Sequence, residues 1–329
     1  MEVFFLNKVF KSVEEQIKLL ESRGLKFSDK AKAQAYLLTN NYYSIINGYS
    51  KIFMDSDSDK YISGATFDEI ISLYFFNREL RKTLLDSLLL AEHHLKSILA
   101  YRFEEYYQGK KEAYLDVSSF NHEKSLDISY IITKISRTIT NKSRYKNNAI
   151  NHYREKYNFV PLWVMVEFLE FGDILTLIKV LPTDLQNKIA HDCYNFIKRE
   201  NKDSEHGQFS PNIMISFIEV LKDLRNACAH DDVLLNFNSI KTAIYYPYLH
   251  DIHDSIIRDD DKTRRTVYCA MIILECFISN NEFAILNNTV RKRFRNLENK
   301  VHSVSLDKIL SELGFPQEWQ RRDPLPQLS

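Results

Sequence analysis

The residues of this chain best suited to chemistry are an arginine, an asparagine and a histidine that lie close together in the sequence. They are Arg225, Asn226 and His230, in the stretch Arg-Asn-Ala-Cys-Ala-His. A guanidinium holds a phosphate through a fixed fork of donors, a histidine gives or takes a proton near neutral pH, and an amide supplies neutral hydrogen bonds. The three groups are suited to cutting RNA, because RNA carries its own nucleophile, the 2′-hydroxyl.

A predicted helix over Pro211–Ala229 positions these groups. Ser210 is the expected N-cap, the proline after it suits the first helical position, and apolar residues then recur at steps of three and four. Arg225 lies on or beside the buried stripe. His230 lies about 140° further round an ideal helix, on the face of Asn226. We therefore expect His230 at the helix end, near a cleft.

A second predicted helix supplies an acidic group. The stretch Thr66–Glu69 has the form of a capping box, and apolar residues follow at steps of three and four as far as Phe103, as one long helix or two in line. Glu92 falls on this stripe, where an unpaired charge is costly to bury. Arg225 is the expected partner of Glu92. The alternative is that Glu92 lies at the edge of the stripe and reaches solvent.

The composition indicates an all-α protein. The 329 residues include 7 Gly and 7 Pro, few for a turn-rich β protein, and 44% are hydrophobic, enough for a large core. No run of about 18 apolar residues occurs, so we expect no membrane span. The N-terminus lacks the basic region of a signal peptide. The four cysteines form no CxxC pattern, which favours reduced thiols and a cytoplasmic location.

The net charge is zero, but basic residues are unevenly distributed. The range from Thr133 to Tyr157 contains seven lysines and arginines but one acidic residue, and tyrosines are interleaved with them. Such a segment can bind phosphates along an RNA backbone and stack on its bases. The candidate RNA-binding residues are Lys142, Arg144, Lys146, Arg154 and Lys156, and in a second cluster Arg291, Lys292 and Arg293. Taken singly, each cluster also fits an ordinary solvated face.

Two other arrangements of chemical groups are weaker. Arg199 and His206 flank a polar loop in which nothing holds their geometry. His250 and His253, each followed by an aspartate, could form a metal site on a helix. No third ligand stands at a suggestive spacing, so polar surface residues are the preferred interpretation. We expect neither a metal nor another cofactor.

The expected organisation has three parts: an N-terminal helical region over 1–64, a helical core over 65–300 with a basic, polar insertion near 109–158, and a tail over 301–329 with a short helix. Further helices are expected over Ser12–Arg23, Ser28–Thr39, Asn41–Phe53, Trp163–Phe171, Asp173–Val180, Leu185–Lys198, Thr263–Ser279 and Lys308–Leu313.

The hexamer at 225–230 resembles the R-x4-H motif of the HEPN superfamily, in its R-N-x3-H form. Longer blocks are similar to the Abi phage-resistance family, the AbiD and AbiF-like proteins. These blocks are, in order, Glu15–Leu25, Asn41–Tyr49, Leu73–Arg81, Glu92–Ser97, Pro161–Gly172, Leu224–His230 and Gly314–Trp319. Asn77 stands where the family usually has Asp, Lys96 replaces Arg, and residues 231–233 lack the second histidine and the arginine that often follow the motif.

The resemblance implies a HEPN-type helical bundle with an N-terminal helical extension. It also implies a toxin-like, metal-independent endoribonuclease associated with abortive infection, related to the RNA-cutting effectors of type VI CRISPR systems. Some members are encoded beside a structured non-coding RNA, so an RNA or protein partner is implied as a regulator. HEPN proteins usually pair two motifs across a dimer cleft, which implies a homodimer.

Under this resemblance His230 is the general base or acid and Arg225 holds the non-bridging phosphate oxygens. Asn226 positions the histidine or the phosphate, and Glu92 orients Arg225 without contacting the substrate. Two alternatives remain. The first is a non-catalytic HEPN module that binds an RNA or protein partner, and the second is a metal-dependent hydrolase.

Overall fold

The computed structural model describes residues 10–197, 209–253 and 255–327. Within these ranges the regular secondary structure is helical, and strand-like pairing is limited to two isolated bridges, Lys26–Thr66 and Met54–Tyr61. The prediction of an all-α protein is confirmed. The α-helices are α1 (Val13–Ser22), α2 (Lys30–Asn40), α3 (Phe67–Tyr106), α4 (Ser125–Lys142), α5 (Ala149–Tyr157), α6 (Leu162–Met165), α7 (Phe171–Val180), α8 (Thr183–Ile197), α9 (Pro211–Ala229), α10 (Pro247–His250), α11 (Val267–Ile273), α12 (Asn280–Glu298) and α13 (Leu306–Glu312).

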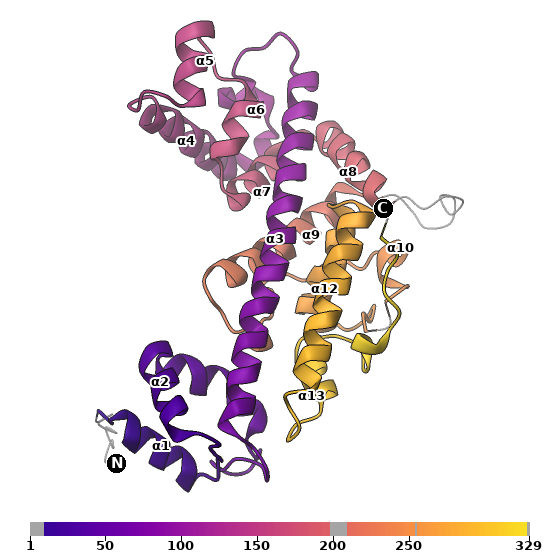
Figure 1. The fold of residues 1–329 in the computed structure, drawn as a ribbon. Coiled ribbons are helices and arrows are strands. Elements are labelled where there is room, and N and C mark those ends of the chain that lie inside the picture. The colour runs from indigo at the N-terminus through magenta and orange to yellow at the C-terminus, as the bar shows by residue number, and fades with distance from the viewer. Residues whose placement is uncertain (1–9, 198–208, 254, 328–329) are drawn as a thin grey trace, which may run out of the picture.

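Helix α3 is the axis of the molecule. It is one unbroken helix of 40 residues, about 60 Å long at 1.5 Å per residue. Its start is set by the predicted capping box, in which Thr66 Oγ1 accepts from the Glu69 N–H and the Glu69 carboxylate accepts from the Thr66 N–H. Helices α1 and α2 lie beside its first turns, α4 to α7 gather at its other end, and α8, α9 and α12 lie along it (Figure 1).

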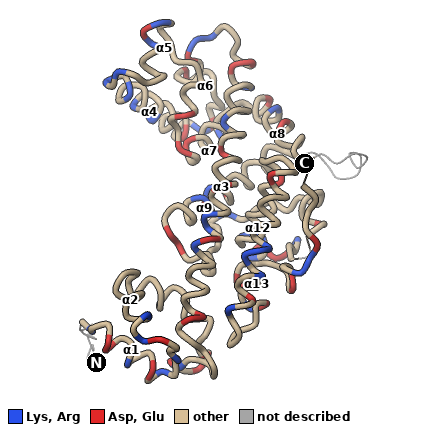
Figure 2. The backbone as a smooth tube through the Cα atoms, in the orientation of Figure 1, with Lys and Arg blue, Asp and Glu red and all other residues tan. Residues whose placement is uncertain are grey.

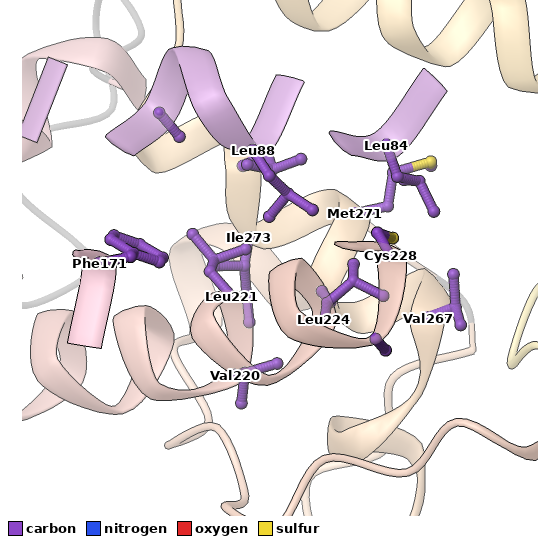
Figure 3. Close-up of a cluster of buried hydrophobic side chains, with 14 of the residues drawn as sticks. Leu84, Leu88, Phe171, Val220, Leu221, Leu224, Cys228, Val267, Met271 and Ile273 are labelled. Carbon is purple, nitrogen blue, oxygen red and sulfur yellow. The ribbon is translucent and has the colours of Figure 1, made fainter. Parts of the chain in front are cut away.

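The core beneath the Arg-Asn-x3-His segment is built from α9 and the helices around it. Helix α9 packs against α3, α7, α8 and α11, and Figure 3 shows its apolar side chains among those of α3, α7 and α11. The buried residues that meet there include Leu84 and Leu88 from α3, Phe171 from α7, Leu221, Leu224 and Cys228 from α9, and Met271 and Ile273 from α11. Because α9 is enclosed on several sides, the position of its C-terminal end is set by apolar packing.

Three predicted helices are wrong in detail. In the range Thr263–Ser279 the α-helix is limited to α11, with 3-10 turns over Thr263–Arg265 and Leu274–Cys276 on either side, because Thr266 caps a new helix.

In place of a helix over Asn41–Phe53 the chain forms a π-helical turn over Tyr43–Asn47 and a 3-10 turn over Lys51–Phe53. Asn41 has a positive φ of 58°, and its side chain accepts from the Tyr43 N–H at 3.0 Å. An asparagine side chain that bonds its own backbone in this way competes with helix formation.

The helix predicted over Trp163–Phe171 ends early. Helix α6 continues as a 3-10 turn only to Phe168, and α7 begins at Phe171, so Gly172 lies in the first turn of α7 and does not terminate a helix. The cause is Asp173, whose carboxylate accepts from the Glu170 N–H at 3.1 Å and so caps a new helix.

Besides the four-residue α10, three helices were not predicted. The basic insertion near 109–158 contains α4 and α5, and α12 follows the capping box of Ser279 and Glu282. In α4 the buried positions are Ile128, Ile131, Ile135 and Ile139, at steps of three and four. This apolar stripe is helical, but it is narrow and lies among polar and basic residues that dominate the composition.

The three expected regions share one hydrophobic cluster, which includes Ile17 from the first region and Trp319 from the last. Polar contacts also link them: Glu69 Oε1 accepts from the N–H groups of His302 and Ser303, each at 2.7 Å. Burial by itself raises the pKa of the Glu69 carboxyl, but these donors outweigh it and lower the pKa below its usual value. The boundaries at 64 and 300 stay predictions.

None of the described helices combines the length and apolar character needed to cross a bilayer. All four cysteines are free and buried. Burial raises the pKa of Cys228 and of Cys269 to about 12, so both thiols stay protonated and unreactive near neutral pH.

Replacing Leu88 by alanine tests the packing between α3 and α9. Leu88 is fully buried, so Leu88→Ala should lower the free energy of unfolding by about 2–5 kcal/mol, measured by urea denaturation. Its sequence neighbour Leu89 is 46% exposed on the same helix and is the matched control. Leu89→Ala should change the free energy by no more than about 0.5 kcal/mol. Equal losses for the two variants would contradict this account of the core.

Candidate functional site

The helix that carries the Arg-Asn-x3-His segment has the predicted ends. The Ser210 hydroxyl accepts from the Ile213 N–H at 3.4 Å, the following proline is the first residue of α9, and the last is Ala229. His230 is the C-cap, and its N–H donates to the Asn226 carbonyl at 2.9 Å. The imidazole therefore stands on the last turn of a helix whose other face is packed in the core.

Asn226 and His230 line the same pocket, as the helical spacing predicted. We call it the motif pocket; its volume is about 490 Å³. Both side chains are exposed to solvent there. The other lining residues are Asp223 and Ala227 from α9 and Asp232, Val233, Asn236, Phe237, Asn238 and Ile240 from the segment that follows. Arg225 is not part of this wall, because its side chain points toward α3.

Arg225 faces Glu92, which is the partner that the sequence predicted. Arg225 Nε lies 3.8 Å from Glu92 Oε2, and the Glu92 side chain is only 9% exposed, so the alternative that it reaches solvent is wrong. A closer partner was not predicted: Lys96 Nζ lies 2.9 Å from Glu92 Oε1, one turn along α3. One buried carboxylate thus meets two cations, which offsets the cost of burying it.

The contact between Arg225 and Glu92 leaves hydrogen-bonding capacity unused. Neither Arg225 Nε nor Glu92 Oε2 has a hydrogen-bond partner. The Arg225 side chain is 29% exposed, so its guanidinium is partly open to solvent. It is therefore held near α3 by charge, and its exposed part is accessible to an anion.

The segment after His230 is held by two buried residues of α3 that sequence reasoning missed as functional. Asn77 accepts from the Leu234 N–H at 2.8 Å and donates to the Asp232 carbonyl at 3.3 Å. Arg81, one turn further, pairs with the Asp231 carboxylate. A signal was present in the sequence, because both polar residues stand on the apolar stripe of α3, as Glu92 does.

Asp223 holds the other end of that segment. Its Oδ2 accepts from the Ser239 hydroxyl and from the Ile240 N–H, both at 2.9 Å. Residues 231–240 are therefore fastened to α3 at one end and to α9 at the other. The motif pocket lies between these attachment points, so its shape follows from them.

The candidate RNA-binding residues of the basic insertion lie on α4, on α5 and between them, and all five are exposed: Lys142, Arg144, Lys146, Arg154 and Lys156. None of them lines the motif pocket. Helix α4 contacts α7, which in turn contacts α9. Figure 2 shows this basic group at the far end of the molecule from α1 and α2. Helix α7 therefore connects the basic insertion with the helix that carries the motif pocket.

The second basic cluster has partners within the protein. Arg291 is buried and donates to the Arg322 carbonyl, while Arg293 Nη1 lies 2.9 Å from Glu79 Oε2. Burial lowers the pKa of Arg291. Lys292, between them, is exposed. Two of these three side chains therefore help to hold α12 against its neighbours.

The interpretation of the histidines considered for a metal as polar surface residues is wrong for His250. His250 is fully buried, and its Nδ1 accepts from the Tyr246 N–H at 3.0 Å. Burial lowers the pKa of His250 to about 3, so the ring is neutral. His253 contacts Glu275 at 3.3 Å. Among the described residues no group of three His, Cys, Asp or Glu side chains could hold a metal ion. Arg199, His206 and Asp254 lie outside the described residues.

Fold and site define an all-helical protein whose polar pocket opens at the C-terminal end of a core helix. The chain belongs to the family of Abi-like proteins, which it matches over residues 35–236, more than half of its length. The matched range contains α3, α9 and the whole segment from Asn226 to Asn236. The blocks Glu15–Leu25 and Gly314–Trp319 lie outside it. Comparison with curated proteins and with solved structures found no match.

The hold of Asn77 on the motif pocket can be measured by hydrogen exchange. In Asn77→Ala the Leu234 N–H loses its acceptor, so its exchange should be faster by about tenfold, equivalent to the loss of about 1.4 kcal/mol. The His302 and Ser303 amides, which donate to Glu69, are the internal control and should keep their rates. Unchanged exchange at Leu234 would show that Asn77 does not hold this segment.

Proposed function

We propose that this protein is a toxin-like endoribonuclease of the HEPN type that acts in abortive infection, in the cytoplasm and without a metal. The observation that carries the proposal is that Asn226 and His230 line the same wall of the motif pocket. Arg225, on the same helical turn, faces Glu92 of α3. These are the groups that RNA cleavage by the 2′-hydroxyl requires: a proton carrier, a neutral donor and a cation for the phosphate.

In the proposed reaction the 2′-hydroxyl oxygen attacks the adjacent phosphorus and the 5′-oxygen leaves. The products are a 2′,3′-cyclic phosphate and a 5′-hydroxyl. His230 takes the proton of the 2′-hydroxyl or gives one to the 5′-oxygen, and Asn226 positions the imidazole or the phosphate. Arg225 stabilises the charge that builds up on the non-bridging oxygens. Glu92, itself held by Lys96, positions the guanidinium.

The proposed active form is a homodimer. The reaction needs two proton transfers, and among the described residues the motif pocket is lined by one imidazole, that of His230. Arg225 is absent from the wall of that pocket, although its guanidinium is partly exposed. A second copy would supply the missing groups by placing its own Arg225 and His230 in the shared cleft. An RNA or protein partner that controls access to this cleft would regulate the toxin.

The second candidate is a non-catalytic HEPN module that binds an RNA or protein partner. It is favoured by the same separation of Arg225 from the motif pocket, because a chain that only binds has no need to bring the two groups together. The two candidates differ in one measurable property, the appearance of cut RNA that depends on His230.

Substitution in the Arg-Asn-x3-His segment separates these candidates. Expression of the wild-type chain should arrest growth, and Arg225→Ala or His230→Ala should abolish the arrest, because each removes a group that the reaction needs. His191→Ala is the matched control, since His191 is an exposed histidine on α8. Purified wild-type protein should cut RNA in EDTA and leave 5′-hydroxyl and cyclic phosphate ends, detected by end-specific ligation.

Several outcomes would contradict the proposal. Undiminished toxicity of folded Arg225→Ala and His230→Ala proteins would exclude this site. Cleavage that stops in EDTA and returns with a divalent ion would indicate a metal-dependent hydrolase. Growth arrest that depends on His230 without any cut RNA would favour the binding module.

The basic insertion should control RNA affinity separately from cleavage. Neutral replacement of Lys142, Arg144 and Lys146 should reduce the slope of log affinity against log salt by up to about 2, because each phosphate contact on a single strand releases about 0.7 of a counterion. At saturating RNA the cleavage rate should be close to that of the wild type.

The control is a triple variant with the same change in charge at scattered exposed positions, Lys60, Lys262 and Lys300. Equal salt slopes for the two triple variants would show that the insertion is only a solvated face.

A further inference from the structure

A second hollow adjoins the motif pocket on the side of the N-terminal helices. We call it the N-terminal pocket. It is enclosed by the segment 40–49, by the first turns of α3 and by the chain that leaves α9, which Figure 1 shows beside α3 on the side of α2. The two pockets have Asp232, Val233 and Asn236 in common. Gly48 keeps the walls close together, because a Cβ at Gly48 would lie 3.0 Å from a methyl group of Val233.

Flat groups that can stack on a ring line this hollow. Tyr43 is 68% exposed in its wall. Tyr74 of α3 also lines this pocket, and its hydroxyl donates to Asn40 Oδ1 at 3.3 Å. Arg78 is held with its guanidinium 4.8 Å from the centre of the Phe75 ring. Tyrosine rings and arginine planes are the surfaces on which unpaired bases stack in RNA-binding proteins.

Hydrogen-bonding groups that could read a base edge are also present and unused. Asn47 is exposed in the wall, and its amide bonds to no described residue. Arg81 is 6% exposed, and although one of its terminal nitrogens pairs with Asp231, its Nε has no partner. A buried donor without a partner is costly, so a ligand that reaches it gains a hydrogen bond.

The wall of the N-terminal pocket also offers hydrogen-bond acceptors. Asp231 and Asp232 both line it. Carboxylates accept hydrogen bonds from the exocyclic amino groups of bases. The proposed reaction places an RNA phosphate beside His230, in the motif pocket, and the residues shared by the two pockets place the neighbouring base in the N-terminal pocket.

We propose that the N-terminal pocket binds one unpaired nucleobase of the RNA whose adjacent phosphate is held at His230, and that it sets the base preference of cleavage. Adenine, cytosine and guanine carry exocyclic amino groups and should be preferred over uracil. This inference rests on the proposed ribonuclease function for its effect on cleavage. Base binding itself can be tested without any cleavage.

The binding test uses His230→Ala protein, so that the RNA stays intact. A set of short RNAs carries the fluorescent base 2-aminopurine at successive positions. One position should be quenched several-fold on binding, as expected for a stacked base, and adding Tyr43→Ala should remove most of that quenching. Tyr101→Ala is the matched control, because Tyr101 is also an exposed tyrosine, at 64%, but lies on α3 away from this pocket.

Quenching that persists in the Tyr43→Ala protein, or quenching at no position, would overturn the inference. If free 2-aminopurine riboside 5′-monophosphate binds with the same affinity as the labelled RNA, the pocket is a site for free nucleotides and not a subsite for RNA. That result would also overturn the inference.

The cleavage test compares wild-type protein with a Tyr43→Ala, Asn47→Ala double variant on a library of RNAs that differ in the bases beside the cut. The double variant should lose the preference against uracil and show a KM raised about tenfold, while kcat changes less. An unchanged preference would overturn this inference and leave the ribonuclease function intact. If wild-type protein cuts no RNA, the ribonuclease function fails, and the fluorescence test alone decides whether the pocket binds a base.

Discussion

Each polar side chain that α3 buries needs a partner, and for Asn77, Arg81 and Glu92 the partners belong to the segments that form the site. Glu69 binds the N–H groups of residues 302–303, Asn77 and Arg81 bind the segment after His230, and Glu92 meets Arg225. An unsatisfied buried group costs about 1–3 kcal/mol, so these contacts are not optional. One long helix therefore sets the positions of elements that lie up to 234 residues away in the sequence.

The site combines a rigid part with a part that is tied down at its ends. Helix α9 is rigid because apolar side chains enclose it, as Figure 3 shows. The segment 231–240 has little regular structure and relies on hydrogen bonds to Asn77 and Asp223. Asn226 and His230 belong to the rigid part, while the opposite wall belongs to the segment. Such an arrangement holds the proposed chemical groups on a packed helix and leaves the opposite wall dependent on a few hydrogen bonds.

The residues that the family resemblance groups together do not all lie together in the structure. The sequence pattern drew attention to Arg225, Asn226 and His230, and the structure separates them: Arg225 faces Glu92, and the other two face the motif pocket. Asp231, the residue after the motif histidine, pairs with Arg81 of α3. A cation at position 231 would be repelled by the Arg81 guanidinium.

The sequence by itself determined the features that depend on neighbours in the chain. The ends of α9, the capping box of α3 and the shared face of Asn226 and His230 follow from cap residues and helical periodicity, which act within a few residues. Local rules failed where a side chain diverted the backbone, as at Asn41, and where a narrow stripe lay among charges, as in α4. Only the tertiary structure decided that Asn77 binds Leu234 and that residues 40–49 adjoin the motif pocket. Such pairings depend on which buried groups meet across the fold, and no local periodicity encodes them.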